Sequence, residues 1–126
     1  MHADDTVLLI DDHADLRDGL EILLGQEGYS VETAANGRDA LIKLYSGLRP
    51  CLIVMDLMMP VMNGFEFRQA QLADERLADI PIVAYSGITD PAANRQLRAA
   101  AYLHKPSDPE QLAAVVRLLC PRSAHD

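Results

Sequence analysis

Five side chains suited to phosphate chemistry stand at or just after the ends of short apolar runs. They are Asp11, Asp12, Asp56, Ser86 and Lys105. Carboxylates held close together repel one another, and a bound cation relieves that repulsion. Mg²⁺ suits such a group, because it prefers hard oxygen ligands and is usually held by one or two carboxylates with phosphate and water. If these side chains meet, one carboxylate could accept a phosphoryl group while the metal, the ammonium and the hydroxyl balance its charge.

Each of these residues also has a plainer interpretation when it is taken alone. An aspartate after a strand is more often a helix cap than a ligand, and Asp12 could cap the helix that follows it. An isolated Ser86-Gly87 pair suggests a turn, and an isolated Lys105-Pro106 pair suggests an exposed loop. The functional hypothesis therefore depends on coincidence, because four strand ends each carry a residue suited to the same reaction.

Five short stretches have the patterns of β-strands. They are Thr6–Ile10, Tyr29–Ala34, Cys51–Met55, Ile80–Tyr85 and Ala101–His104. The first, third and fourth are nearly unbroken apolar runs, which are typical of strands buried on both faces of a parallel sheet. The second alternates between polar and apolar residues, as edge strands do. The last is short and gives the weakest signal.

Helical patterns fill the intervals between these strands. Two clear stripes follow the spacing of a helix face, namely Leu16, Leu20, Leu23, Leu24 and Leu112, Val115, Val116, Leu119. Shorter stripes cover Ala40–Tyr45 and Ala93–Ala100, and the segment after Asn63 is the least periodic. Asp90-Pro91 and Asp108-Pro109 predict capped helix starts, Asn63 with Glu66 predicts a capping box, and Gly28 and Gly47 predict helix ends.

The alternation of these elements predicts an α/β fold. Five successive βα units are expected to form a doubly wound, parallel five-stranded sheet with helices on both faces and right-handed crossovers. Ligands of such open sheets bind at the carboxyl ends of the strands. The five chemically suited side chains are therefore expected to converge on one rim of the molecule.

The composition indicates an ordinary globular chain of 126 residues. This length predicts one domain over residues 1–126, with a core from about residue 6 to residue 120. A formal net charge of −8 disfavours direct binding to nucleic acid. The apolar run Val7–Ile10 is too short for a signal peptide or a membrane span. The cytoplasm is therefore the predicted location, with no membrane partner.

The chain contains two cysteines, Cys51 and Cys120, and both lie in apolar sequence. Free cysteine is frequently buried, so both are predicted to be reduced core thiols. There is no Cys-x-x-Cys pair and no cluster of cysteine with histidine, which excludes the usual zinc-binding patterns.

Taken in this order, the residues resemble the receiver domains of two-component response regulators. The resemblance extends from Val7 to Leu119. Its most specific part is the nine-residue segment Asp56–Gly64. It is supported by the acidic pair Asp11-Asp12, by Ser86 and by the pair Lys105-Pro106. The resemblance implies a flavodoxin-like sheet with strand order 2-1-3-4-5.

The resemblance also implies a role for each matching residue. Asp56 is the expected phosphoacceptor, Asp12 and Asp56 are expected to bind Mg²⁺ (or Mn²⁺) directly, and Asp11 is expected to act through water. The backbone carbonyl of Met58 completes the expected protein ligands. Lys105 is expected to pair with the phosphoryl oxygens from a cis Lys105-Pro106 peptide. Ser86 and Tyr102 are the expected switch pair, and His13 is expected to start a helix beside the site without binding metal.

The implied partners are a histidine kinase or a histidine phosphotransfer domain as donor, and a downstream protein that the sequence does not name. Phosphorylation is expected to change the face formed by the fourth helix, fifth strand and fifth helix. The resemblance implies a monomer or a weak, phosphorylation-dependent homodimer. It implies no enzymatic turnover beyond the chain's own phosphorylation and slow dephosphorylation. Met58 and Ile88 are apolar and cannot orient an attacking water, which predicts a long-lived phosphoryl group.

The sequence departs from the family pattern at Arg98–Ala101, where many relatives carry Gly-Ala and acidic residues, and at Ser107, where Phe is common. The first departure leaves the end of the fourth helix open, and the second weakens assignment to the dimerising transcription factors.

Three alternatives remain. An aspartyl phosphatase would need an acid at Met58, a flavin or nucleotide module would need a glycine-rich phosphate loop that is missing, and a degenerate receiver would act only as an interaction module.

Overall fold

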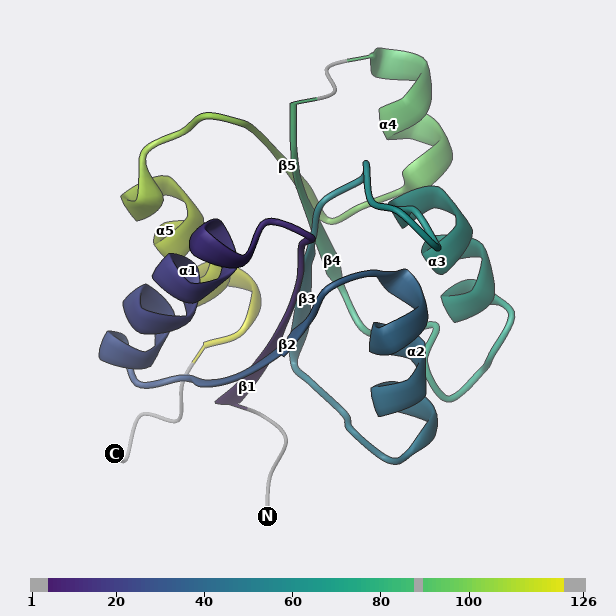
Figure 1. Cartoon of the computed structure of the whole chain (residues 1–126), viewed down its shortest axis with the longest axis horizontal. Helices are drawn as coiled ribbons and strands as arrows, with labels where there is room; N and C mark the ends of the chain where they lie inside the picture. The colour runs from purple at the N-terminus through teal and green to yellow at the C-terminus, as the bar shows by residue number, and fades with distance from the viewer. Residues whose placement is uncertain (1–4, 88–89, 122–126) are drawn as a thin grey trace.

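The computed structural model describes residues 5–87 and 90–121, in which five strands alternate with five helices (Figure 1). The strands are β1 (Thr6–Ile10), β2 (Ser30–Ala34), β3 (Leu52–Met55), β4 (Ile82–Ser86) and β5 (Ala101–His104). The helices are α1 (Ala14–Gln26), α2 (Gly37–Tyr45), α3 (Gly64–Leu72), α4 (Pro91–Leu97) and α5 (Pro109–Leu119). The predicted alternation of strand and helix is therefore confirmed.

All five strands belong to one parallel sheet with the order β2-β1-β3-β4-β5. This confirms the predicted fold class and strand order. Strands β3 and β4 are buried along their whole length, as their unbroken apolar runs predict, whereas β2 and β5 lie at the edges and alternate in exposure. Because the strands are parallel, all their carboxyl ends lie at the same edge of the sheet.

The sheet separates two hydrophobic cores. Successive side chains of a strand point to opposite faces, so Leu8 and Ile10 of β1 enter one core while Val7 and Leu9 enter the other. Figure 1 shows α1 and α5 on one face of the sheet and α2, α3 and α4 on the other. This arrangement fixes the strand ends firmly, because each central strand is held from both sides.

The helix starts follow the chemistry expected from the sequence. Asn63 and Glu66 form a capping box at α3, and Asp90 and Asp108 cap α4 and α5 with Pro at the start of each helix. The start of α1 differs from one interpretation considered above. His13, not Asp12, occupies the N-cap position of α1, so the capping role considered for Asp12 is wrong.

Several element bounds also differ from those expected, and β2 and β3 each begin one residue late, at Ser30 and Leu52. Helix α4 ends at Leu97, because Arg98 adopts a left-handed conformation with φ of 55°. The small-residue stripe Ala93–Ala100 therefore predicted too long a helix. Strand β4 begins at Ile82 and not at Ile80. Pro81 has no N–H to donate to a ladder, although its carbonyl accepts a hydrogen bond from Ile53.

The prediction of two reduced thiols is wrong, because Cys51 and Cys120 form a disulfide. Cys51 immediately precedes β3, and Cys120 immediately follows α5. Their Cα atoms lie 5.7 Å apart, within the range that a disulfide spans. Composition alone did not indicate the pairing, because it depends on α5 packing against the start of β3. Beside it, the hydroxyl of Tyr29 donates to the carbonyl of Cys120 at 2.6 Å.

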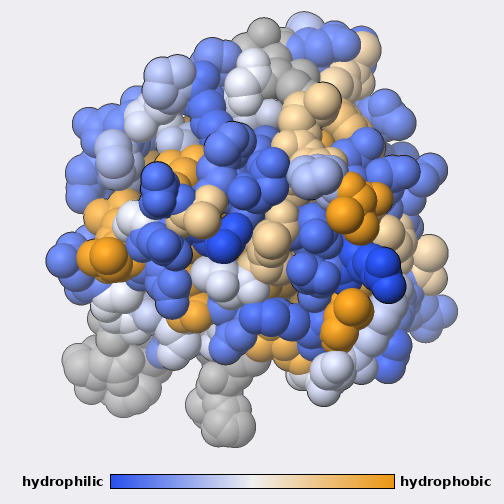
Figure 2. All heavy atoms as spheres, in the orientation of Figure 1, coloured by the Kyte–Doolittle hydropathy of each residue, from blue (hydrophilic) through white to orange (hydrophobic). Residues whose placement is uncertain are grey.

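The surface seen in Figure 2 is largely hydrophilic, and its hydrophobic residues form separate patches. The exposed large apolar side chains include Ile22, Ile42 and Leu72. Among the helices of residues 5–87 and 90–121, none has the length and apolar character needed to cross a bilayer.

Candidate functional site

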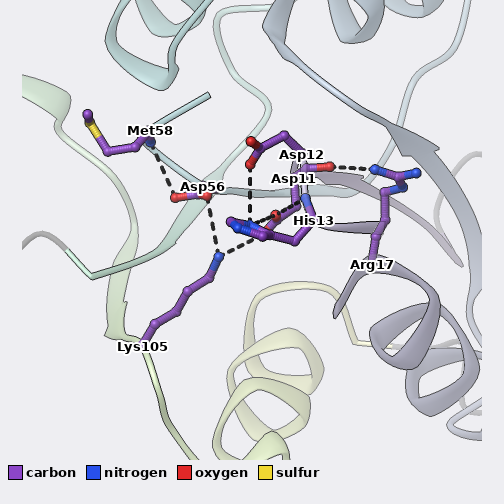
Figure 3. A network of polar contacts seen from close by, with 7 residues as sticks. All are labelled: Asp11, Asp12, His13, Arg17, Asp56, Met58 and Lys105. Carbon is purple, nitrogen blue, oxygen red and sulfur yellow. Dashed lines mark hydrogen bonds and ion pairs between the residues drawn. The ribbon is translucent and has the colours of Figure 1, made fainter. Parts of the chain in front are cut away.

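The acidic residues predicted to converge do so at the carboxyl edge of the sheet. Asp11 and Asp12 follow β1, and Asp56 follows β3, which pairs directly with β1. One ligand atom each from Asp11, Asp12, His13 and Asp56 all lie within 4.8 Å of one another. Asp11 and Asp56 are buried, whereas Asp12 is exposed. Figure 3 shows the three carboxylates gathered around a common space.

This donor set fits a hard divalent cation. Three carboxylates offer the oxygen ligands that Mg²⁺ prefers, and the exposure of Asp12 leaves the cluster open to water and to a phosphoryl group. Burying Asp11 and Asp56 side by side is unfavourable unless cations compensate their charge. The acidic residues present therefore fit a divalent cation such as the predicted Mg²⁺.

Lys105 provides one of the compensating charges. Its Nζ lies 2.7 Å from Oδ2 of Asp11 and 3.4 Å from Oδ2 of Asp56. The Lys105-Pro106 peptide is cis, as the resemblance implied, and the Lys105 amide donates to the Ser86 carbonyl, which extends the β4–β5 ladder. Burial alone lowers the pKa of Lys105, but the hydrogen bond and charge of Asp11, together with Asp56, outweigh it and raise the pKa above its ordinary value.

The loop after Asp56 folds back tightly on the acceptor. The Met58 amide lies 3.3 Å from Oδ1 of Asp56 and donates to it. Farther along, the Met62 amide donates to the carbonyl of Pro60 around Val61, whose φ is 70°. The Gly64 amide then donates to the carbonyl of Leu57 at 3.0 Å. The structure thus places Met58 beside the acceptor, while metal binding by its carbonyl stays a prediction.

Ser86 and Tyr102 line one cavity between β4, β5 and α4. This cavity has a volume of about 120 Å³, and Leu57 and Asn94 also line it. Ser86 is buried at the end of β4. Tyr102 is 37% exposed, and its hydroxyl donates to the carbonyl of Asn94 and accepts from the amide of Ala99. The two predicted switch residues therefore share one space.

Two further residues touch the acidic cluster. The ring of His13 lies 3.2 Å from Asp11 and 3.4 Å from Asp12, so the predicted helix-start residue also contacts the carboxylates. The guanidinium of Arg17 donates to the backbone carbonyl of Asp11 at 2.7 Å. Sequence reasoning missed Arg17, because a contact with a backbone atom six residues away leaves no sequence pattern. Ile88, which the lifetime prediction used, lies outside the described residues.

Comparisons with known proteins agree with this geometry. Residues 7–117 match the family described as the response regulator receiver domain. The chain is 36% identical over 121 residues to the response regulator Rre1 of Synechocystis. The aligned region covers 93% of this chain and 52% of that protein. It is 38% identical over 120 residues to the transcriptional regulator RpaA of Synechocystis, covering 93% of this chain and 49% of that one. The chain thus spans about half the length of these relatives.

Solved structures give the same result. The chemotaxis protein CheY4 of Vibrio cholerae superposes with a TM-score of 0.83 at 35% identity, covering 90% of this chain and 97% of that one. The response regulator TrrA of Thermotoga maritima, solved in complex with Mg²⁺ and BeF, gives a TM-score of 0.80 at 28% identity, covering 91% and 98%. From sequence, fold and site together, this chain belongs to the response-regulator receiver domain family of two-component systems.

Proposed function

We propose that this receiver domain accepts a phosphoryl group on Asp56 from a phosphohistidine of a histidine kinase or histidine phosphotransfer domain. The observation that carries the proposal is the meeting of Asp11, Asp12, Asp56 and Lys105 at one strand edge. The complete set favours this function over a degenerate receiver, which would have no reason to keep two buried carboxylates together.

The chain's own residues would divide the work of the transfer. A carboxylate oxygen of Asp56 attacks the phosphorus, the bond from phosphorus to the donor nitrogen breaks, and the donor imidazole keeps the electron pair and takes up a proton. Lys105, whose Nζ lies 3.4 Å from Oδ2 of Asp56, would neutralise the transferred group, and the Met58 amide would orient Asp56. Asp12 and Asp56, with Asp11 nearby, would hold Mg²⁺, which would supply charge neutralisation for a reaction that depends mainly on positioning and electrostatics.

Labelling by a small phosphodonor tests this function. Phosphoramidate and Mg²⁺ should add one phosphoryl group, which intact mass spectrometry detects, and Asp56→Asn should take none. Asp18→Asn, which removes an exposed carboxylate on α1, should label as the unaltered protein does. Stoichiometric labelling of Asp56→Asn, or failure of the unaltered protein to label with both phosphoramidate and acetyl phosphate, would refute the assignment.

We further propose that phosphorylation switches the face formed by α4, β5 and α5. Ser86 would move toward the phosphoryl group, and Tyr102 would turn into the cavity that the two residues share, whose volume of about 120 Å³ leaves space for part of a ring. That rotation breaks the hydrogen bonds from Tyr102 to Asn94 and Ala99, so it also loosens α4. Beryllofluoride with Mg²⁺ should therefore speed amide exchange in α4, and a pattern unchanged by the ligand would contradict the switch.

The remaining expectations are part of the same proposal. The domain turns over no separate substrate, resides in the cytoplasm, and passes its signal to a protein partner without contacting nucleic acid itself. It is a monomer or a weak homodimer formed on phosphorylation, which light scattering with and without beryllofluoride will distinguish. Met58, exposed beside Asp56, cannot orient a water, so the label should persist well beyond seconds in Mg²⁺ alone.

A further inference from the structure

Arg17 reaches from α1 to the backbone of the acidic cluster. Its Nη1 donates to the carbonyl oxygen of Asp11 at 2.7 Å. The amide of the same residue, Asp11, donates to the carbonyl of Ala34 at 3.1 Å and so continues the ladder between β1 and β2. The carbonyl that Arg17 holds belongs to the peptide bond between Asp11 and Asp12, and this bond joins two of the three carboxylate residues.

The position of this carbonyl explains why it needs a side-chain partner. In a parallel ladder, a residue that donates to one neighbouring strand also accepts from that strand. The last register pair of β1 and β2 is Ile10 with Ala34, and the chain then leaves the sheet to begin α2 at Gly37. The ladder therefore ends just where the Asp11 carbonyl requires a donor, and a buried carbonyl without one is costly. Arg17 takes the place of the missing amide.

Arg17 thus completes the anchoring of Asp11. The carboxylate of Asp11 accepts from the His13 amide at 2.8 Å and from Lys105 at 2.7 Å, while its backbone is held by Ala34 and Arg17. Asp12 is different, because its side chain is 30% exposed and lies 3.4 Å from the His13 ring. The direction of the Asp12 side chain therefore depends on the peptide that Arg17 fixes.

Arg17 and Lys105 act on the cluster from different sides. Figure 3 shows Lys105 approaching the carboxylates of Asp11 and Asp56, and Arg17 approaching the backbone of Asp11 from α1. A cation that enters among the carboxylates competes with Lys105 for their oxygens. It does not compete with Arg17, whose guanidinium is bonded to a peptide oxygen and can keep that bond with or without metal.

We propose that Arg17 is a positioning residue for the phosphoacceptor site. Arg17 holds the Asp11–Asp12 peptide so that the carboxylates of Asp11 and Asp12 both face Asp56. Residues that orient metal ligands without touching the metal typically change metal affinity 10- to 100-fold when replaced. The inference rests on the proposed function, because it assigns Arg17 to the metal and acceptor site described above.

The charge of Arg17 allows a test in which the sign of the effect is decisive. A guanidinium near a cation site repels the cation, so its removal alone should strengthen Mg²⁺ binding. If Arg17 positions Asp12, its removal should instead weaken Mg²⁺ binding despite the lost repulsion. Arg17→Met removes both the charge and the hydrogen bond. Arg17→Lys keeps the charge and most of the side-chain stem but loses the planar fork of donors.

The measurement is the Mg²⁺ dissociation constant, obtained by titrating the protein without phosphodonor and following backbone amide NMR signals. Arg17→Met should weaken binding by about tenfold, and Arg17→Lys should weaken it in the same direction by a smaller factor. In metal-free protein, the amides of Asp11 and Asp12 should exchange faster in Arg17→Met, whereas that of Leu8 in mid-strand should not. Arg38→Met is the matched control, because Arg38 is exposed in the first turn of α2 at the same edge of the sheet. The affinity of the Arg38→Met variant for Mg²⁺ should stay unchanged or rise slightly.

The outcomes separate the two proposals. Unchanged or tighter Mg²⁺ binding in Arg17→Met overturns the positioning role, as does equal weakening in Arg38→Met. If Arg17→Met does not fold, as thermal unfolding in chelator would show, then wild-type affinity in Arg17→Lys overturns the role on its own. An unaltered protein that binds Mg²⁺ but takes no phosphoryl label refutes the proposed function and leaves the positioning of Asp12 by Arg17 intact.

Discussion

The ammonium of Lys105 lies nearer to Asp11, at 2.7 Å, than to Asp56, the proposed acceptor, at 3.4 Å. Lys105 therefore bridges two buried carboxylates that come from different strands. Its contact with Asp11 is a short, charge-assisted hydrogen bond, which is stronger than a neutral one. Because an ammonium has three N–H donors, the same lysine can keep its contact with Asp11 and still donate to a phosphoryl group on Asp56.

The first prediction concerns the pKa of Lys105, which the two carboxylates raise. Asp11→Asn and Asp56→Asn should each lower it, and Asp11→Asn should lower it more because that contact is shorter. NMR titration of the lysine side chains measures this directly. The pKa of Lys105 in the folded state is above its ordinary value of 10.5. The contacts of Lys105 with the two carboxylates therefore stabilise the fold fully below pH 10.5. That stabilisation is lost as the pH rises through the folded-state pKa.

The second prediction concerns Gly64, which begins α3. A Cβ there would lie 2.8 Å from Cδ2 of Leu57, 2.9 Å from its Cα and 3.0 Å from the carbonyl of Asp56. Gly64→Ala should therefore displace the acceptor loop, lower the free energy of unfolding by about 1–3 kcal/mol and slow labelling by phosphoramidate. Urea denaturation and mass spectrometry measure the two effects.

Gly19→Ala is the matched control for that substitution. Apart from its chain neighbours and the backbone of its own helix, a Cβ at Gly19 meets no described heavy atom within 4 Å, and the residue lies inside α1. Alanine there should raise stability by about 0.5–1 kcal/mol and leave labelling unchanged. Equal behaviour of the two variants would show that the loop tolerates a side chain at Gly64.

The third prediction concerns the disulfide between Cys51 and Cys120. It closes a loop with a sequence separation of 69 residues, and disulfides typically give about 2–4 kcal/mol of stabilisation. Reductant should lower the urea midpoint of the unaltered protein by a corresponding amount. The double variant Cys51→Ser, Cys120→Ser should match the reduced protein and ignore reductant. A midpoint that reductant does not change would contradict the predicted contribution.

The fourth prediction concerns Arg68 on α3, which supports the end of α4. Its guanidinium donates to the carbonyls of Leu97 and Arg98 at 2.9 Å each, and to the side chain of buried Gln71 at 2.8 Å. The last carbonyls of a helix have no partner within that helix. Arg68→Met should therefore speed amide exchange in α4 and cost about 1–3 kcal/mol.

Arg95→Met removes an exposed arginine from α4 itself and serves as the control for Arg68→Met. It should leave exchange in α4 close to that of the unaltered protein. If both variants exchange alike, the end of α4 does not depend on Arg68. If Arg68→Met also increases the response to beryllofluoride, the contacts of Arg68 restrain the proposed switch.

Much of the site was predictable from sequence because its signals are local. An apolar run followed directly by Asp11 or Asp56 indicates a buried strand. It also indicates which residue stands at the carboxyl end of that strand. Parallel pairing then brings such ends together whatever their separation in the chain. Caps such as Asn63 with Glu66 are equally local, since donor and acceptor are three residues apart.

Other features depend on residues that only folding brings together. The Cys51–Cys120 bond requires α5 to pack beside the start of β3, and the bond from Arg17 to the Asp11 carbonyl requires β2 to end where it does. The early end of α4 is set by Arg98 in a left-handed conformation that Arg68 holds from α3. By itself, the sequence determined the order of elements and the chemistry at the strand ends, because periodicity and capping act over a few residues. Only the tertiary structure decided which partners hold that chemistry in place, because those contacts depend on how distant elements pack.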